Sequence, residues 1–334
     1  MEKDKIQHRS ISIDALKGFA ALLVCYQHAY GTYGISGYIL AISRIAVPLF
    51  VMITGFYYCS IVDKHKEKVQ IKKFAFIAIV MVLLYFSIDS AKRIFTGNLI
   101  GYWKSCFTPL NILKFVVLND PVHADHSWYM WAMIYVLVLV WLFPRIWKQK
   151  CIRRSIIILT CFGLPFLSKY IYFFCTSINF EPNLYRNFLI PIAAYFFLGI
   201  ECLEKKDKIT RFGMKKWGIL AILSVACICM EKYILTILKI DRLSGAYFFS
   251  MPLAVAVFGM TLSGSFKSKG MNILAKFGRK YSLAFYIIHP LFSRVEYKIF
   301  NMETVQQYAG YVFVVLCSAM LSVLYENIKE KRGI

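Results

Sequence analysis

The chain has 334 residues, of which 59% are hydrophobic and 17% charged, and its formal net charge is +22. Soluble globular domains are about half apolar and about a quarter charged, so this composition excludes a soluble domain and predicts an integral membrane protein. Ten apolar stretches are long enough to be membrane helices. They lie at residues 11–31, 38–61, 73–91, 127–147, 154–174, 186–203, 216–236, 244–264, 281–300 and 307–327.

The basic residues are distributed unequally between alternate loops. One set of loops carries 27 lysines and arginines, and the other set carries 9. Because Lys and Arg are enriched in cytoplasmic loops, this bias predicts that both termini are cytoplasmic. It also assigns the positive charge to topology and anionic lipid rather than to nucleic acid. We therefore expect an all-α, polytopic helix bundle with about ten transmembrane helices in the plasma or inner membrane.

A single integral membrane domain is expected over residues 1–334, because no repeat or low-complexity run divides it. The one long connection is the outer segment 92–126. Its interior, PLNILKFVVLN, is apolar, and long loops in compact bundles are often functional, so we expect an ordered cap over the outer face. The outer cysteines Cys106 and Cys175 are possible disulfide partners, and the sequence leaves their pairing open.

The first predicted helix carries Asp14 and Lys17 near its start and His28 at its end. Ionisable residues are costly within membranes, and they often serve function there. Lys17 and His28 are separated by a helical rise of roughly 16 Å, about half of a bilayer core. Histidine is well suited to general-base chemistry near neutral pH, although it also serves as a structural hydrogen-bonding group.

Two arginines and one aromatic segment are further candidates on the outer side. Arg44 falls inside the second predicted helix at a depth comparable to His28, where it needs an acceptor or reaches the interface. Arg186 opens the sixth helix, with Glu181 as a possible partner. His126 and Trp128 are expected to line an outer pocket, although Trp128 also suits the interfacial aromatic belt.

The sequence favours neither a metal site nor a catalytic role for the histidine in the middle of the membrane. His123, Asp125 and His126 are close in sequence, but polar loop residues are more often solvated, so no metal site is expected. His289 precedes Pro290 near mid-membrane, and we interpret it as satisfying local backbone, with its role left open. The signatures of P-loop, dinucleotide-binding, zincin and serine-hydrolase enzymes are missing.

The chain resembles the acyltransferase-3 family of integral membrane acyltransferases. The matching stretches are RSISIDALKGFAALLVCYQH (9–28), AVPLFVMITGFYY (46–58), HSWYMWAMIYVLVLVWLFP (126–144), YRNFLIPIAAYFFLGIE (185–201) and GRKYSLAFYIIHPL (278–291). The resemblance implies transfer of an acyl group, usually acetyl, from cytoplasmic acyl-CoA to an extracytoplasmic glycan or related acceptor.

The resemblance also assigns residues to roles. His28 matches the family's essential histidine, and Lys17 stands where many members have arginine. Lys72 and Lys73 occupy the family's basic entry to the third helix, and Arg186 matches the arginine before the F-x-x-G helix. Thr54 replaces the serine of an SGF-like motif and keeps a hydroxyl.

The implied mechanism is O-acyl transfer without a metal. Lys17, Lys72 and Lys73 would bind acetyl-CoA, and His28 would deprotonate the acceptor hydroxyl. Arg44 or Arg186 would hold the acceptor or the developing oxyanion. The acceptor, a glycan or lipid-linked sugar, is not identified by the sequence. The alternative is a transporter or flippase that uses the same buried polar residues.

Overall fold

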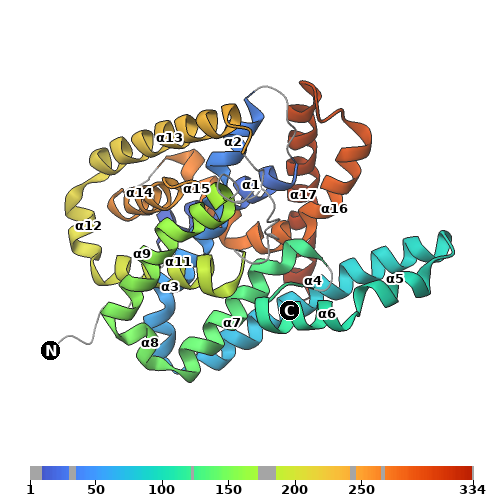
Figure 1. Cartoon of the computed structure of the whole chain (residues 1–334), viewed down its shortest axis with the longest axis horizontal. Helices are drawn as coiled ribbons and strands as arrows, with labels where there is room; N and C mark the ends of the chain where they lie inside the picture. Colours follow the sequence, from blue (N-terminus) through green and yellow to red (C-terminus); the bar gives the residue numbers. More distant parts are fainter. Residues whose placement is uncertain are drawn as a thin grey trace. The chain divides into compact units, whose positions relative to one another are not determined.

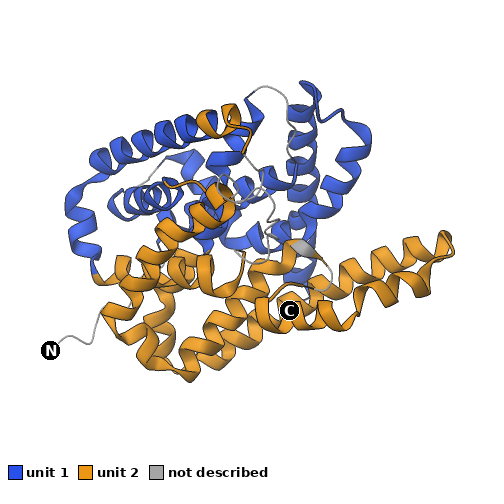
Figure 2. Ribbon diagram, in the orientation of Figure 1, with its two compact units in different colours: residues 1–50, 205–233, 249–334 blue, residues 51–204, 234–248 orange. Residues whose placement is uncertain are grey.

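The computed structural model describes residues 10–29, 35–121, 124–171, 186–240, 246–264 and 268–332. Within these ranges the chain is helical and contains no strand, so the predicted all-α class is confirmed. Every apolar stretch expected from the sequence contains a helix. The chain forms two compact units, which are coloured separately in Figure 2: Met1–Phe50 with Lys205–Tyr233 and Phe249–Ile334, and Val51–Glu204 with Ile234–Phe248.

The first unit is organised around its N-terminal helix, α1, which contacts five other helices of the unit and the π-helical turn η5. Figure 1 labels its α-helices. The elements of this unit are α1 (Ile11–His28), α2 (Ser36–Ser43), the start of α3 (Ala46–Asp63), α12 (Lys206–Phe212), most of α13 (Met214–Ile237), α14 (Ser250–Ser263), α15 (Lys269–Lys276), η5 (Phe277–Tyr281), α16 (Ser282–Ile299) and α17 (Gln306–Lys331).

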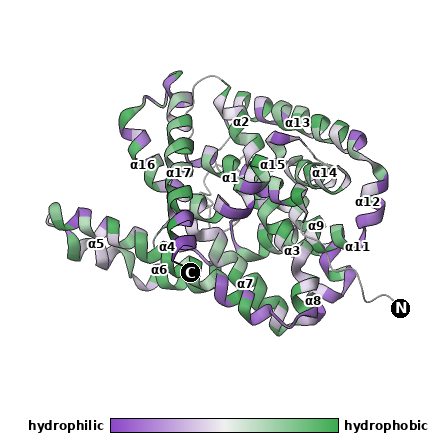
Figure 3. Cartoon of the chain, turned by 180° about the vertical axis from the view of Figure 1, so that it is seen from behind, coloured by the Kyte–Doolittle hydropathy of each residue, from purple (hydrophilic) through white to green (hydrophobic). Residues whose placement is uncertain are grey.

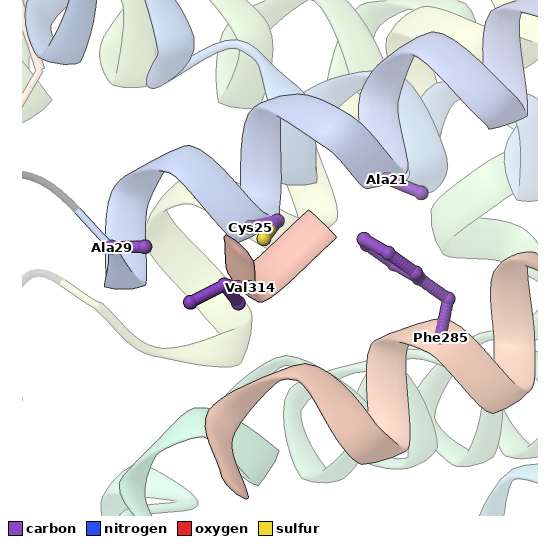
Figure 4. Packing of buried hydrophobic residues seen from close by; sticks show 5 residues of the cluster. All are labelled: Ala21, Cys25, Ala29, Phe285 and Val314. Carbon is purple, nitrogen blue, oxygen red and sulfur yellow. The ribbon is translucent and has the colours of Figure 1, made fainter. Parts of the chain in front are cut away.

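Small side chains allow the helices of this unit to approach α1 closely. Ala21, Cys25 and Ala29 recur every fourth residue along one face of α1, and they pack with Phe285 of α16 and Val314 of α17 (Figure 4). Further toward the start of α1, a Cβ atom on Gly278 would collide with the carbonyl oxygen of Asp14. Small residues at helix interfaces permit such backbone contact in membrane proteins.

The second unit holds the rest of α3 and the middle of the chain. Its elements are α4 (Glu67–Phe95), α5 (Leu99–Cys106), α6 (Pro109–Leu118), η1 (Asp125–Ser127), α7 (Trp128–Leu142), α8 (Pro144–Lys148), α9 (Lys150–Pro165), η2 (Phe166–Tyr170), η4 (Phe188–Ile192) and α11 (Ala193–Glu204). Helices α3 and α11 touch through backbone, because a Cβ on Gly55 would collide with the Phe196 carbonyl and one on Gly199 with that of Met52.

The second predicted helix is interrupted at Arg44, which lies in the turn between α2 and α3 rather than within a helix. Pro48 explains this difference, because a proline lacks an N–H group and its ring clashes with the carbonyl four residues earlier. That carbonyl belongs to Arg44. Gln27 satisfies the neighbouring carbonyl of Ser43 with a hydrogen bond of 2.6 Å.

Five helical segments of the described chain are long and apolar enough to cross a membrane: Ser36–Asp63, Glu67–Phe95, Lys150–Tyr170, Met214–Ile237 and Gln306–Lys331. Hydrophobic residues predominate along α13 and α17 in Figure 3. In the most apolar part of α13 only 17% of the residues are buried by the protein. Apolar surface of this extent requires a non-aqueous partner, so these faces suit lipid. The count of ten spans and the cytoplasmic termini stay predictions.

Candidate active site

Lys17 and His28 lie on the same face of α1. Eleven helical residues rotate the chain by about 20° beyond three full turns and raise it by roughly 16 Å. The two side chains are therefore aligned along the helix axis, with Lys17 in the second turn and His28 as the last helical residue. His28 is exposed. The spacing predicted from the sequence is thus realised as one strip of one helix.

The Lys17 end of α1 is rich in charged groups. The Lys17 Nζ atom lies 3.4 Å from the Asp14 Oδ1 atom. The close approach of Gly278 to Asp14 brings the backbone of Arg279 and Lys280 to this end of α1. Lys280 donates a hydrogen bond of 2.7 Å to Glu330, which raises the pKa of its ammonium group. This end of the first unit therefore carries several cations.

The imidazole of His289 lies beside that of His28, with ring centroids 5.2 Å apart and planes tilted by 52°. His289 is fully buried on α16, where its Nδ1 atom is 3.1 Å from the Phe285 carbonyl oxygen. The sequence treated His289 as a separate structural residue. The structure instead puts both histidines in one cluster.

The buried face of α16 continues this polar cluster. His289, Ser293 and Glu296 follow one another at helical spacing, and Glu296 is only 1% exposed. The Glu296 carboxyl faces Gly310 of α17, near the buried Gln307. This face was not predicted from the sequence, although polar residues at positions i, i+4 and i+7 of an apolar helix indicate it.

Arg44 belongs to the same unit as His28. The hydrogen bond from the Gln27 side chain to the Ser43 carbonyl joins the last turn of α1 to the turn that contains Arg44. Arg44 is half-buried. The structure thus brings the Arg44 backbone to the His28 end of α1, as a shared role requires.

The expected acceptor residues lie in the second unit. His126 is buried in η1, and its ring packs edge-on against Tyr85 of α4 with centroids 4.2 Å apart. Trp128 is half-buried at the start of α7. The hydroxyl groups of Thr54 and Tyr129 share a hydrogen bond. The first of these contacts joins α4 to η1, and the hydrogen bond joins α3 to α7.

The other predicted basic residues also belong to the second unit. Lys72 and Lys73 are exposed near the start of α4, and Arg186 is half-buried in the bend before η4. His123, Cys175 and Glu181 lie outside the described residues. Within the described ranges, no group of three or more His, Cys, Asp or Glu side chains is arranged to hold a metal ion.

Two cations of the second unit are buried, which the charge pattern did not reveal. Arg153 was counted among the loop residues that set topology, but its side chain is 1% exposed and binds Glu201. Lys169 is fully buried in η2, with its Nζ atom 4.3 Å from the centre of the Tyr247 ring. The expectation that loop cations only contact lipid is therefore wrong for Arg153.

The family profile described as "Acyltransferase domain" matches residues 10–324, which is nearly the whole chain. The chain belongs to the acyltransferase-3 family. The chain is also similar to an "Amino-acid racemase" of Enterococcus faecalis, with 25% identity over 356 aligned residues. The match covers 98% of this chain and 47% of the relative, so the chain spans about half the length of that protein. No solved structure matches the chain.

Proposed function

We propose that this membrane acyltransferase moves an acetyl group from cytoplasmic acetyl-CoA to a hydroxyl of an extracytoplasmic glycan or lipid-linked sugar. The observation that carries the proposal is the alignment of Lys17 and His28 along one face of α1. The separation of roughly 16 Å suits a donor whose anionic end binds near Lys17 and whose thioester reaches His28.

The proposed step is a nucleophilic acyl transfer. His28 takes the proton of the acceptor hydroxyl while its oxygen attacks the thioester carbonyl carbon. The carbon–sulfur bond then breaks, and the leaving thiolate takes the proton from His28 to give CoA. Arg44, which follows the residue bound by Gln27, is a candidate to stabilise the developing oxyanion.

Residues of the second unit take supporting roles in this proposal. Lys72 and Lys73 bind the anionic donor, and Arg186, His126 and Trp128 contact the acceptor. Charged and aromatic side chains suit these tasks, because phosphates need cations and sugar rings pack on aromatic faces.

The test is a direct assay of the purified protein in lipid nanodiscs. Acetyl-CoA should lose its acetyl group to water or a glycan acceptor, and free thiol should appear. Cells that lack the gene should also lose O-acetyl signals from their surface glycans by NMR. If acetyl-CoA is untouched with every acceptor, while labelled sugar or amino-acid solutes cross proteoliposomes, the transporter alternative replaces the enzyme.

A further inference from the structure

The tautomer of His289 is set by its surroundings. A carbonyl oxygen only accepts hydrogen bonds, so the 3.1 Å contact with the Phe285 carbonyl requires the proton on Nδ1. A fully buried imidazolium would be costly, so the ring is neutral and its lone pair is on Nε2. The ring also stacks on Phe285, with centroids 5.9 Å apart and planes within 16°.

The Nε2 atom of His289 is buried and makes no hydrogen bond among the described residues, and the distance between the two rings leaves room for one from His28. An imidazole nitrogen lies roughly 1.2 Å from its ring centre, so centroids 5.2 Å apart allow two facing nitrogens to approach to about 2.8 Å. His289 is held inside the unit, whereas His28 is exposed at the end of α1. The buried ring of His289 is therefore the more firmly held member of the pair.

We propose that His289 is a positioning residue that accepts a hydrogen bond from the ring N–H of His28. The other nitrogen of His28 then carries the lone pair and faces the acceptor hydroxyl. A second group that fixes the tautomer and orientation of a basic histidine is a recurrent feature of catalytic and metal sites. The catalytic part of this inference rests on the proposed function.

Activity of paired variants tests the positioning role. His289→Leu removes the acceptor nitrogen. We expect the rate of acetyl transfer to fall roughly 10²-fold, which is the lower end of the effect of removing a general base. His289→Gln keeps an acceptor near the Nε2 position and should recover at least tenfold of that loss. The His28→Ala, His289→Leu double variant should be no slower than His28→Ala alone, because the two residues act as one unit.

A merely structural His289 predicts other results. In that case His289→Gln lowers the activity as much as His289→Leu does. The loss of activity in the double variant is then the product of the two single losses. Ser322→Ala is the matched control, since Ser322 is a buried serine of the same unit that donates to a helix carbonyl, that of Ser318 on α17. Its activity should stay near wild type.

A chemical readout separates this inference from the proposed function. Diethyl pyrocarbonate acylates the unprotonated nitrogen of accessible histidines, and mass spectrometry follows the peptide that contains His28. We expect His289→Leu to slow the modification of His28 several-fold and His289→Gln to restore it. Equal rates in all three proteins would overturn the positioning role, even if the protein transfers no acetyl group.

A second, independent inference concerns α5 and α6, which the sequence predicted as part of an outer cap. Helix α5 folds back along α4, where Trp103 donates a 3.0 Å hydrogen bond to Ser90. The rings of Tyr102, Trp103 and Phe107 lie 5.7 to 6.0 Å from that of Phe86. Because Phe86 belongs to a candidate membrane span, α5 lies at the depth of that span's apolar part.

Helix α6 lies at a similar level against α7. The Phe115 ring is 4.9 Å from that of Trp131, and Tyr135 donates a 3.0 Å hydrogen bond to the Phe115 carbonyl. None of the residues of α6 is buried. The exposed apolar side chains of the two helices and of their connection are Ile100, Trp103, Phe107, Leu110, Ile112, Leu113, Val116 and Val117.

We infer that α5 and α6 form a lipid-embedded pair in one leaflet, the outer one by the predicted topology. Their exposed apolar faces would contact acyl chains. Lys92 and Arg93 at the end of α4 and Lys104 on α5 suit lipid phosphates. The occupant of this surface is therefore the bilayer rather than another protein.

Photo-crosslinking in the native membrane tests this surface. A benzoylphenylalanine at Leu113 or Val117 should form lipid adducts as readily as one at Ile222, which is 71% exposed on a candidate span. The same group at Lys208, in the polar and exposed α12, should form few. Crosslinks from Leu113 to protein alone, or no adduct, would overturn the inference and favour an aqueous cap.

Discussion

Arg153 donates two hydrogen bonds to a single carboxylate oxygen of Glu201, from Nε at 3.2 Å and from Nη2 at 2.7 Å. Its Nη2 atom also bonds Glu204 at 2.8 Å, and Nη1 bonds the Trp147 carbonyl. The side chains of Arg153 and Glu201 are 1% and 5% exposed. This ion pair joins α9 to α11 within the second unit.

We expect Arg153→Ala to destabilise the protein by about 3–5 kcal/mol, because it leaves the buried Glu201 carboxylate with the exposed Arg154 as its cationic neighbour. Thermal unfolding in detergent measures the effect. Arg154→Ala is the matched control, since Arg154 contacts the same carboxylate at 3.5 Å but is 52% exposed. Exposed ion pairs contribute little, so its cost should stay within about 1 kcal/mol. Equal losses in the two variants would contradict the network.

Two helical glycines should respond oppositely to alanine. A Cβ on Gly55 would meet the Phe196 backbone, so Gly55→Ala must push α3 and α11 apart, at a cost of about 1–3 kcal/mol. A Cβ on Gly163 would meet nothing within 4 Å. Gly163→Ala should be neutral or stabilising by up to about 1 kcal/mol through helix propensity. A stable Gly55→Ala protein with normal thermal unfolding would argue against the α3–α11 contact.

The helix positions could be predicted because each is a run of apolar residues of sufficient length. The break at Arg44 was also readable, since Pro48 four residues later removes the support of its carbonyl. The burial of Arg153 could not be predicted from the sequence. Arg153 and Arg154 stand side by side in one basic segment, and only their angle on α9 decides which of them points into the protein.

Only part of the candidate site could be predicted, because the sequence gives the spacing of residues along one helix but not the packing between helices. The alignment of Lys17 with His28 follows from the helical period, so spacing alone provides it. The meeting of His28 with His289 depends on how α1 and α16 pack, and hydropathy does not encode that. The small residues Ala21 and Cys25 show that a helix approaches this face of α1, but they do not identify it.

The topology prediction is testable with an impermeant maleimide on intact cells. Asn98→Cys, at the exposed connection between α4 and α5, should react from outside. Lys66→Cys and the native exposed Cys151 should react only after permeabilisation, because the basic loops are predicted to be cytoplasmic. Outside labelling at position 66 would invert the assignment.

The donor prediction concerns Lys17. Lys17→Ala should weaken CoA binding roughly tenfold at low salt, the equivalent of one charge-assisted hydrogen bond of about 1.5 kcal/mol. The difference from wild type should shrink at high salt, where charges are screened. Lys17→Arg should bind as well as wild type or better, since a guanidinium holds phosphate with two hydrogen bonds. The Lys72→Ala/Lys73→Ala variant tests the two lysines of the second unit in the same assay. Unchanged affinity for CoA in both variants would mean that these lysines serve topology alone.

The sharpest prediction is that His28 is the catalytic base. Removing a positioned general base typically costs roughly 10²- to 10⁴-fold in rate, so His28→Ala should lose nearly all transfer. Because His28 is exposed at the end of α1, the variant should still insert and show wild-type thermal unfolding. His65→Ala, an exposed loop histidine, is the matched control and should keep full activity. A well-folded His28→Ala protein with near wild-type acetyl transfer would refute the mechanism, since no other base in the proposal takes the hydroxyl proton.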